Sequence, residues 1–150
     1  MQMKKIITGA VLVVFGILAW DLLLSHRYEC SRPLTVQEAT RRSPVPLPAS
    51  ATNVYVATDR HMVAYSDYVR FEAPVDDCMA HAALLLGDDH SRVPITPDSP
   101  ARWNFIGFKK GLSWFNIHNI SNGTAFGGGF SPVRCWIDSD RHIFYYCRTD

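Results

Sequence analysis

The sequence lacks an excess of charge of either sign, because 15 lysines and arginines are matched by 14 aspartates and glutamates. Lys4 and Lys5 are two of the basic residues and Asp21 is one of the acidic ones, so residues 25–150 carry 13 of each. Proteins that bind nucleic acids or anionic membrane surfaces concentrate positive charge on one face. We therefore expect no nucleic-acid partner and no polybasic membrane patch.

The sequence also lacks the common catalytic and metal-binding motifs, since it contains no HExxH, CxxC, GxSxG or SxxK pattern. The compact run Asp88-Asp89-His90 lies in a polar loop before Pro94 and is more typical of a solvated turn than of a metal site. The run Gly127-Gly128-Gly129 has no following helix or lysine, so it indicates a turn or bulge rather than a phosphate loop. We expect no metal, no cofactor and no catalytic residue.

Cysteine is sparse, but the number is even. In a small domain behind an export-like segment, four cysteines indicate two disulfides formed in an oxidising compartment, although four reduced thiols are an alternative. The disulfide candidates are Cys30, Cys78, Cys135 and Cys147. Their connectivity is open: a bridge between Cys135 and Cys147 needs a hairpin centred near Arg141, whereas the polar turn suggests a centre near 139–140.

The longest apolar segment runs from Ile6 to Leu24 and follows a short basic head. As a helix its 19 residues span roughly 28 Å, close to the hydrocarbon thickness of a bilayer. We interpret residues 1–25 as a signal anchor, that is, a single transmembrane helix, with a cleaved signal peptide as the alternative. Cys30 is a poor lipidation site because Arg27-Tyr28-Glu29 precede it.

The anchor and the cysteines together predict a single-pass protein of the bacterial inner membrane with its C-terminal domain outside the cytoplasm. Arginines at positions 27–42 favour the opposite orientation, which stays open. Residues 26–52 include alternating prolines from Pro44 to Pro48, which are typical of a stiff tether. The folded domain is expected at 53–150.

Hydrophobic alternation predicts strands over Val54–Ala57 and Val63–Ala73, and an alanine- and leucine-rich helix over Cys78–Leu86. Residues 87–101 are expected to be a loop. The final segments Val133–Ile137 and Ile143–Cys147 predict a hairpin. The predicted fold class is α+β: an N-terminal transmembrane helix, then a small domain with an antiparallel sheet packed against one main helix.

Three segments carry a resemblance to known proteins: Leu47–Val54, Val69–Cys78 and Trp136–Asp150. They resemble a group of small, uncharacterised bacterial envelope proteins and lipoproteins that share an LPxSAxNV opening, an RFxxPxxD strand-to-helix step and a terminal WxD…YYxxxD hairpin. The resemblance covers residues 45–150 and implies a bacterial, exported protein. It implies no activity, and no functional residue carries over from it.

These observations favour a non-enzymatic binding or interaction module with a protein partner in the envelope. The candidate surfaces are the aromatic region Trp103–Phe130 and the loop 87–101. An envelope hydrolase acting on a glycan or peptide is one alternative. A glycan-binding domain is the other, although a domain of this size is expected to use most of its aromatic side chains in the core.

Overall fold

The computed structural model describes residues 11–17, 19, 26–60, 64–87, 90–100, 111–127 and 132–149. Seven strands and three short helices follow residues 11–17, which are themselves helical. The elements are β1 (His26–Glu29), α2 (Val36–Arg42), β2 (Thr52–Arg60), β3 (Tyr65–Glu72), α3 (Val75–Leu86), β4 (Arg92–Ile95), η1 (Ile117–Asn119), β5 (Gly123–Phe126), β6 (Val133–Asp138) and β7 (Ile143–Thr149).

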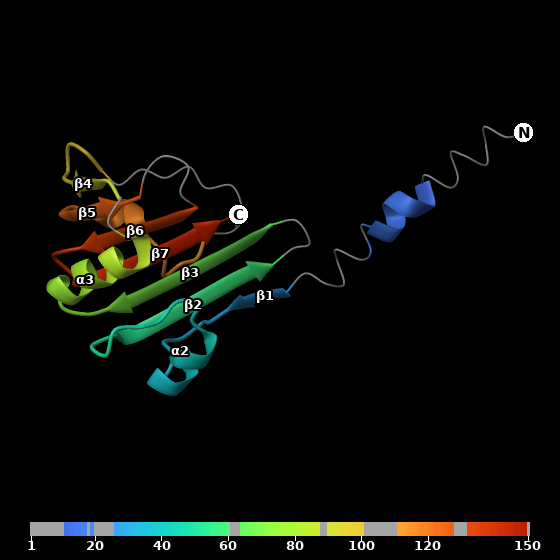
Figure 1. The fold of residues 1–150 in the computed structure, drawn as a ribbon, viewed down its shortest axis with the longest axis horizontal. Helices are drawn as coiled ribbons and strands as arrows, with labels where there is room; N and C mark the ends of the chain where they lie inside the picture. The colour runs from blue at the N-terminus through green and yellow to red at the C-terminus, as the bar shows by residue number, and fades with distance from the viewer. Residues whose placement is uncertain are drawn as a thin grey trace, which may run out of the picture.

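The strands form one antiparallel sheet in the order β1-β2-β3-β7-β6-β5-β4 (Figure 1). The first three strands are consecutive neighbours. After β3 the chain passes through α3 to the far edge of the sheet, and β4, β5, β6 and β7 then return strand by strand until β7 pairs with β3. The two long central strands, β3 and β7, therefore join the two halves of the sheet.

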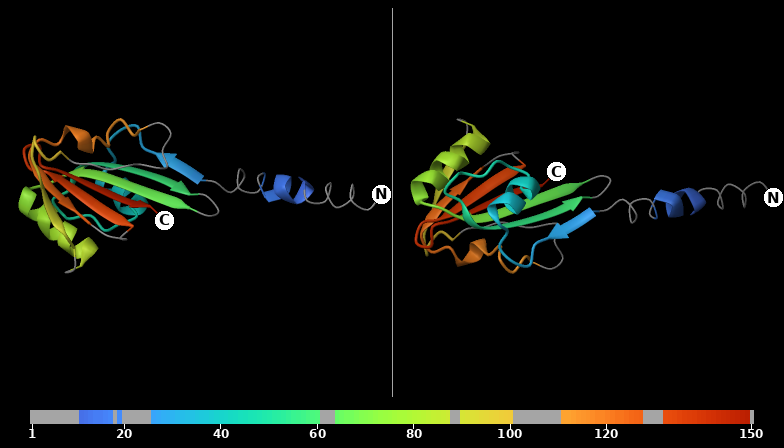
Figure 2. Two further views of the ribbon diagram at one scale, coloured as in Figure 1. Left: turned by 90° about the horizontal axis from the view of Figure 1, so that it is seen from above. Right: turned by 90° about the horizontal axis from the view of Figure 1, so that it is seen from below.

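Each face of the sheet carries its own hydrophobic core. Helices α2 and α3 cover one face, and the segment around η1 covers the other (Figure 2). Alternation along the strands separates the two cores: in β7, Phe144 and Tyr146 contribute to the core beneath α3, whereas Ile143 and Tyr145 contribute to the core beneath η1. A strand buried on both faces reads as a continuous apolar run, as Ile143–Cys147 does.

Helix α3 begins three residues earlier than the predicted helix and ends where it was predicted to end. Pro74 occupies the N-cap position without a side-chain hydrogen bond, and the acidic side chains of Asp76 and Asp77 lie in the first turn, where the helix dipole favours them. Gly87 ends the helix at a φ of 72° and donates its N–H to the carbonyl of Ala83 over 2.9 Å.

The predicted fold class is wrong in two respects. The structure is mostly a seven-stranded antiparallel sheet with three short helices on its two faces, rather than a sheet packed on one main helix. Among the described residues no helix is both long and apolar enough to cross a membrane. Apart from residues 11–17 and 19, the predicted anchor lies outside the described residues, and the cellular location stays a prediction.

Three further segments differ from the sequence-based expectations. Residues 26–52, predicted as a tether, contain β1 and α2, and α2 buries Ala39 in the core beneath the sheet. Strand β2 continues to Arg60, three residues beyond the predicted strand Val54–Ala57. Residues 92–95, predicted as part of a loop, form the edge strand β4, which tolerates Pro94 because an edge strand has one unpaired side.

Candidate functional site

A pocket of about 440 Å³ opens on the face of the sheet that carries η1. It lies between the ends of β2, β3 and β7 on one side and the segment 113–119 on the other. Only two of its twelve lining residues lack a polar group on the side chain. The lining residues are Pro33, Asn53, Tyr55, Arg70, Glu72, Ser113, Trp114, Asn116, Asn119, Arg141, Ile143 and Tyr145. We call this cavity the Trp114 pocket.

A β-bulge shapes one wall of the Trp114 pocket. The register between β2 and β3 shifts between Thr52 and Tyr55, and Asn53 adopts a φ of 47° at this shift. Asparagine tolerates the left-handed region better than most residues, so the sequence suits the bulge. A bulge redirects side chains locally, and the Asn53 amide donates a hydrogen bond of 2.7 Å to the Glu72 carboxylate.

Arg70 is the charged centre of the same wall. Its guanidinium donates to Glu72 Oε1 over 2.7 Å and to the backbone carbonyl of Asn53 over 3.3 Å, and it lies 5.2 Å from the ring centre of Tyr55. Burial raises the pKa of Glu72, but the hydrogen bonds from Asn53 and Arg70 and the charge of Arg70 outweigh it and hold this pKa below its usual value. Glu72 is therefore an ionised, fully engaged carboxylate at neutral pH.

Aromatic rings join this wall to the segment 113–119. The rings of Trp114 and Tyr55 stack with centroids 5.4 Å apart and an interplanar angle of 25°. Phe115 lies behind them and packs edge-to-face on Tyr145 at 5.4 Å and on Trp136 at 6.2 Å. The indole Nε1 of Trp114 is buried, and it has no hydrogen-bond partner among the described residues.

Arg141 approaches the pocket from the turn between β6 and β7. Its guanidinium donates to the Asp138 carboxylate over 2.6 Å and to the carbonyl of Asn119 over 3.2 Å, which ties this turn to η1. Tyr145 lies on the floor, where burial raises the pKa of its phenol while the charges of Arg141 and Arg70 oppose the rise. The Tyr145 hydroxyl consequently stays protonated at neutral pH.

The arrangement provides hydrogen-bonding groups but lacks the features of an acid–base pair. General acid–base catalysis needs a group whose pKa is tuned toward the working pH. The carboxylate that lines the pocket, Glu72, is instead held in its ionised form by Arg70 and Asn53. The amides of Asn116 and Asn119 have no side-chain partners among the described residues and face a cavity of a size typical for small ligands.

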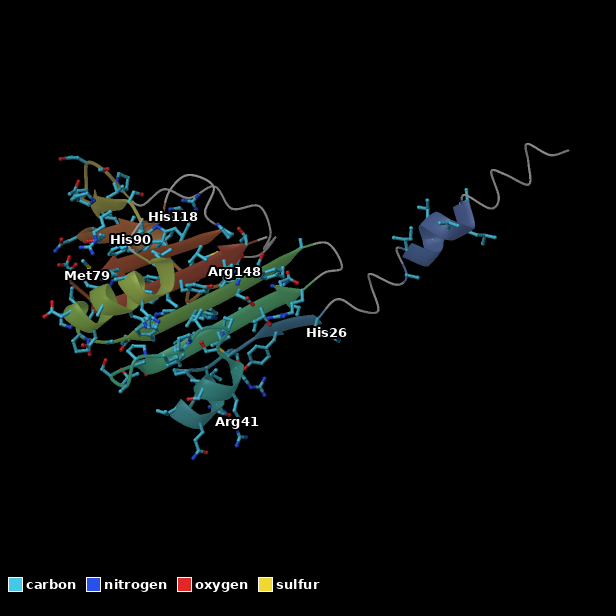
Figure 3. The ribbon with its side chains drawn as sticks, in the orientation of Figure 1. His26, Arg41, Met79, His90, His118 and Arg148 are labelled. Atoms are coloured by element: carbon cyan, nitrogen blue, oxygen red, sulfur yellow. The ribbon has the colours of Figure 1, made fainter. Side chains whose placement is uncertain are left out.

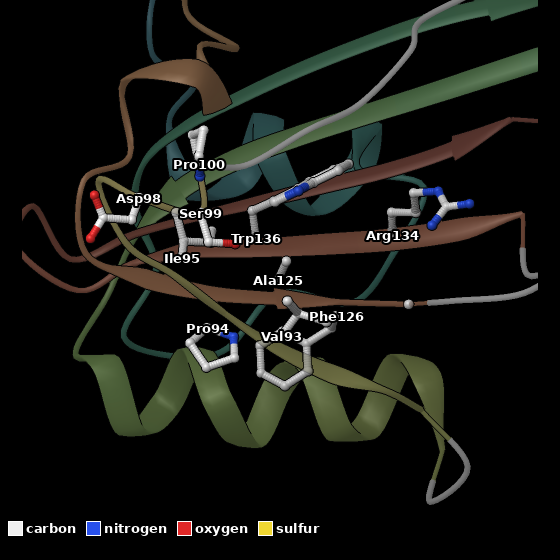
Figure 4. Close-up of a pocket in the computed structure, with 11 residues that line it drawn as sticks. Val93, Pro94, Ile95, Asp98, Ser99, Pro100, Ala125, Phe126, Arg134 and Trp136 are labelled. Carbon is white, nitrogen blue, oxygen red and sulfur yellow. The ribbon is translucent and has the colours of Figure 1, made fainter.

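A second pocket, of about 500 Å³, lies at the sheet edge formed by β4 and β5 (Figure 4). It overlaps both candidate surfaces expected from the sequence and adds Arg134 and Trp136 from β6. Trp136 and Phe126 line it from opposite faces of the sheet, and Asp98 and Arg134 are its charged residues. Its lining includes Pro100 and Gly127, which border segments outside the described residues. Residues 103–110 and 128–130 of the aromatic region Trp103–Phe130 also lie outside the described residues.

A third pocket, of about 590 Å³, lies between residues 46–50 and α3 and is largely apolar. Its polar side chains are those of Ser50 and Asp77, which are hydrogen-bonded to each other over 2.5 Å, and of His81. The imidazole is buried and packs edge-to-face against the stacked rings of Phe71 and Phe144, with centroids 5.5 and 5.3 Å away. Its Nε2 has no hydrogen-bond partner among the described residues. Burial lowers the pKa of His81, so it is neutral at neutral pH.

All four cysteines, Cys30, Cys78, Cys135 and Cys147, are buried free thiols in the structure. In the β6–β7 hairpin Cys135 lies opposite Tyr146 and Arg134 lies opposite Cys147, so Cys135 and Cys147 face different cores. A bridge between them would require a one-residue slip of the register. Burial raises the pKa of every one of these thiols, that of Cys78 to about 11, which disfavours a reactive thiolate. The predicted disulfides remain a prediction.

The described histidines do not converge. His26 lies on β1 at the opposite end of the sheet from His90 and His118 (Figure 3). Asp88 and Asp89 of the ligand-like run lie outside the described residues, and His90 Nδ1 contacts the carbonyl of Gly87. No group of three or more histidine, cysteine, aspartate or glutamate side chains suited to a metal occurs in the described part of the chain.

No protein-family profile, curated protein or solved structure matches this chain. The resemblance to bacterial envelope proteins therefore stays a prediction. Four lining residues of the Trp114 pocket, Ser113, Trp114, Asn116 and Asn119, belong to the predicted surface Trp103–Phe130. The sequence did not reveal the other lining residues, which come from four further segments. The available signal was the alternation of β3, which places Arg70 and Glu72 on the face opposite Val69 and Phe71.

Proposed function

We propose that this protein is a non-enzymatic binding module and that the Trp114 pocket is its recognition site. The observation that carries the proposal is the pairing of its charged groups. Arg70 is bound to Glu72 and Arg141 to Asp138, while the indole N–H of Trp114 and two asparagine amides lack partners among the described residues. Such a site is built to hold a ligand rather than to transfer its protons.

The rigidity of the walls supports this proposal. Tyr55 and Arg70 are cross-strand partners at the centre of the sheet, and Tyr145 comes from the neighbouring strand β7. Side chains on paired strands keep their positions better than side chains on loops, which lowers the entropic cost of binding. The segment 113–119 adds the remaining groups and is fixed to the turn of the β6–β7 hairpin by Arg141.

The experiment is a thermal-unfolding screen of the full-length protein against neutral disaccharides, peptide amides and inorganic phosphate. A ligand present at about 100 times its Kd stabilises the folded state by about 2.7 kcal/mol, which raises the Tm by about 5–15 °C. We expect at least one class to raise the Tm of the wild type and to raise that of Asn116→Ala less.

Two controls make the screen decisive. Leu84→Ala alters an exposed side chain on the opposite face of the sheet, 72% exposed, and should respond like the wild type. Stabilisation that is equal in the wild type, Asn116→Ala and Trp114→Phe would place the binding site elsewhere. Chromatography of the incubated probes should recover them intact, and cleavage that is lost in Glu72→Gln would make the protein an enzyme.

A further inference from the structure

We infer that the ligand of the Trp114 pocket is a neutral, polyhydroxylated molecule, namely a sugar unit of a glycan. This inference rests on the proposed function, since it names the chemical class that the same pocket binds. Three properties of the lining support it: its balanced charge, its unpartnered hydrogen-bonding groups, and its stacked aromatic wall.

The balance of charge argues against a charged ligand. The guanidinium of Arg70 lies 2.7 Å from the carboxylate of Glu72, and that of Arg141 is bound to the buried carboxylate of Asp138. An anion would have to compete with Glu72 for Arg70, and a cation would meet both arginines. A neutral ligand uses the remaining N–H donors of these guanidiniums without breaking either ion pair.

The hydrogen-bonding groups that remain suit hydroxyls. Each amide of Asn116 and Asn119 offers donors and an acceptor, and neither has a side-chain partner among the described residues. The phenol of Tyr145 already interacts with Arg70 through its oxygen, so its O–H, protonated at neutral pH, is the donor left for a ligand. The indole of Trp114 offers a second donor, which is buried without a described partner. A sugar hydroxyl both donates and accepts, so one ring satisfies several of these groups at once.

The ring of Trp114 suits the other face of a sugar ring, where C–H groups are exposed. Tyr55 stacks on one face of Trp114 at 5.4 Å and Phe115 packs edge-to-face against it at 6.0 Å, so the ring is held in place before a ligand arrives. The sugar would stack on the face of Trp114 that is turned away from Tyr55, since Arg70 lies over the Tyr55 ring at 5.2 Å. A peptide is the less favoured occupant. It would need an open strand edge or deep apolar pockets, whereas here Pro33 and Ile143 are the lining residues without a polar side-chain group.

The test is calorimetric titration of the full-length protein, kept in a detergent without a sugar headgroup. The probes are cellobiose, maltose and N,N′-diacetylchitobiose, with glucose 6-phosphate, inorganic phosphate and trialanine amide as the other chemical classes. We expect at least one neutral disaccharide to bind. Its Kd should change less than twofold between about 50 and 500 mM salt, because screening weakens only charged contacts.

The variants separate ring contact from hydrogen bonding. Trp114→Ala removes both the ring and the indole N–H donor and should raise the Kd about tenfold or more. Trp114→Phe keeps a ring but loses the N–H donor and should raise the Kd about threefold. Asn116→Ala should also raise the Kd about threefold. It alters an exposed side chain, so it remains informative if Trp114→Ala does not fold. Leu84→Ala, on the opposite face, is the matched control and should bind like the wild type.

The outcomes are distinguishable. One contrary outcome is that no neutral disaccharide binds, while phosphate or glucose 6-phosphate binds and this binding weakens with salt and in Asn116→Ala. That outcome would overturn the sugar assignment and leave the binding function in place. If only the peptide amide binds, and Asn116→Ala weakens its binding, the sugar assignment is likewise overturned and the binding function stays in place. Failure of every probe to bind would overturn both proposals.

Discussion

Replacement of Asp138 should destabilise the β6–β7 hairpin and the wall that it supports. Asp138 is 1% exposed, and its carboxylate accepts hydrogen bonds from the backbone N–H groups of Asp140 and Arg141, at 3.1 and 3.0 Å, and from the Arg141 guanidinium at 2.6 Å. Removal of one partner of a fully buried ion pair costs about 3–5 kcal/mol. Because the Arg141 side chain is 44% exposed, water solvates the freed guanidinium and the expected loss falls to about 2–3 kcal/mol.

Urea unfolding of Asp138→Ala measures this loss. With an m-value of about 1–3 kcal/mol per molar, the transition midpoint should fall by about 0.7–3 M. Asp138→Asn keeps an acceptor but loses the charge, so it should lose about half as much free energy. Asp140→Ala removes an exposed carboxylate and should lose no more than about 1 kcal/mol. A midpoint for Asp138→Ala that equals the wild-type midpoint would refute the argument that this carboxylate holds the turn.

Three further predictions concern other parts of the sheet. His81→Leu should stabilise the protein by about 0.5–1 kcal/mol at pH 7 in urea unfolding, because it removes a buried, unpartnered nitrogen. The gain should grow as the pH falls below about 6.5, because His81 then takes up a proton in the unfolded wild type, whereas its lowered pKa disfavours the proton in the folded state. A gain that does not depend on pH would contradict this. Gly123→Ala should lose about 1–3 kcal/mol in the same assay, because an added Cβ would lie 2.0 Å from the carbonyl oxygen of Ile137; a neutral effect would contradict this spacing. Mass spectrometry of unreduced protein should find no bridge between Cys135 and Cys147, since they face different cores, and finding one would disprove the register.

Sequence patterns were most informative where one local signal determined the structure. The helix over Cys78–Leu86 is confirmed within α3, and the terminal hairpin is confirmed as β6 and β7. Both combine an unambiguous apolar pattern with a recognisable boundary, Gly87 for the helix and the polar turn 139–142 for the hairpin. The centre of that hairpin, however, depends on the Asp138 hydrogen bonds, which a pattern of apolar residues does not reveal.

The other elements depend on tertiary contacts. Strand β4 contains Pro94 and exposed side chains, so only its pairing with β5 identifies it as a strand. Strand β1 is stabilised by pairing with β2, although its own side chains are mostly exposed. The Trp114 pocket requires the bulge at Asn53, the bridging contacts of Arg141 and the packing of Phe115, which lie far apart in sequence. Local propensity carries little information about such long-range arrangements.

The indole ¹H–¹⁵N resonance of Trp114 tests the central claim most directly. The chain has four tryptophans, and Trp114→Phe assigns this resonance by its loss. On titration with the neutral disaccharide that binds most tightly, the Trp114 resonance should shift more than the other three, because its buried N–H gains an acceptor. A shift of the Trp136 resonance, in the pocket at the β4–β5 edge, with Trp114 unchanged would contradict the account.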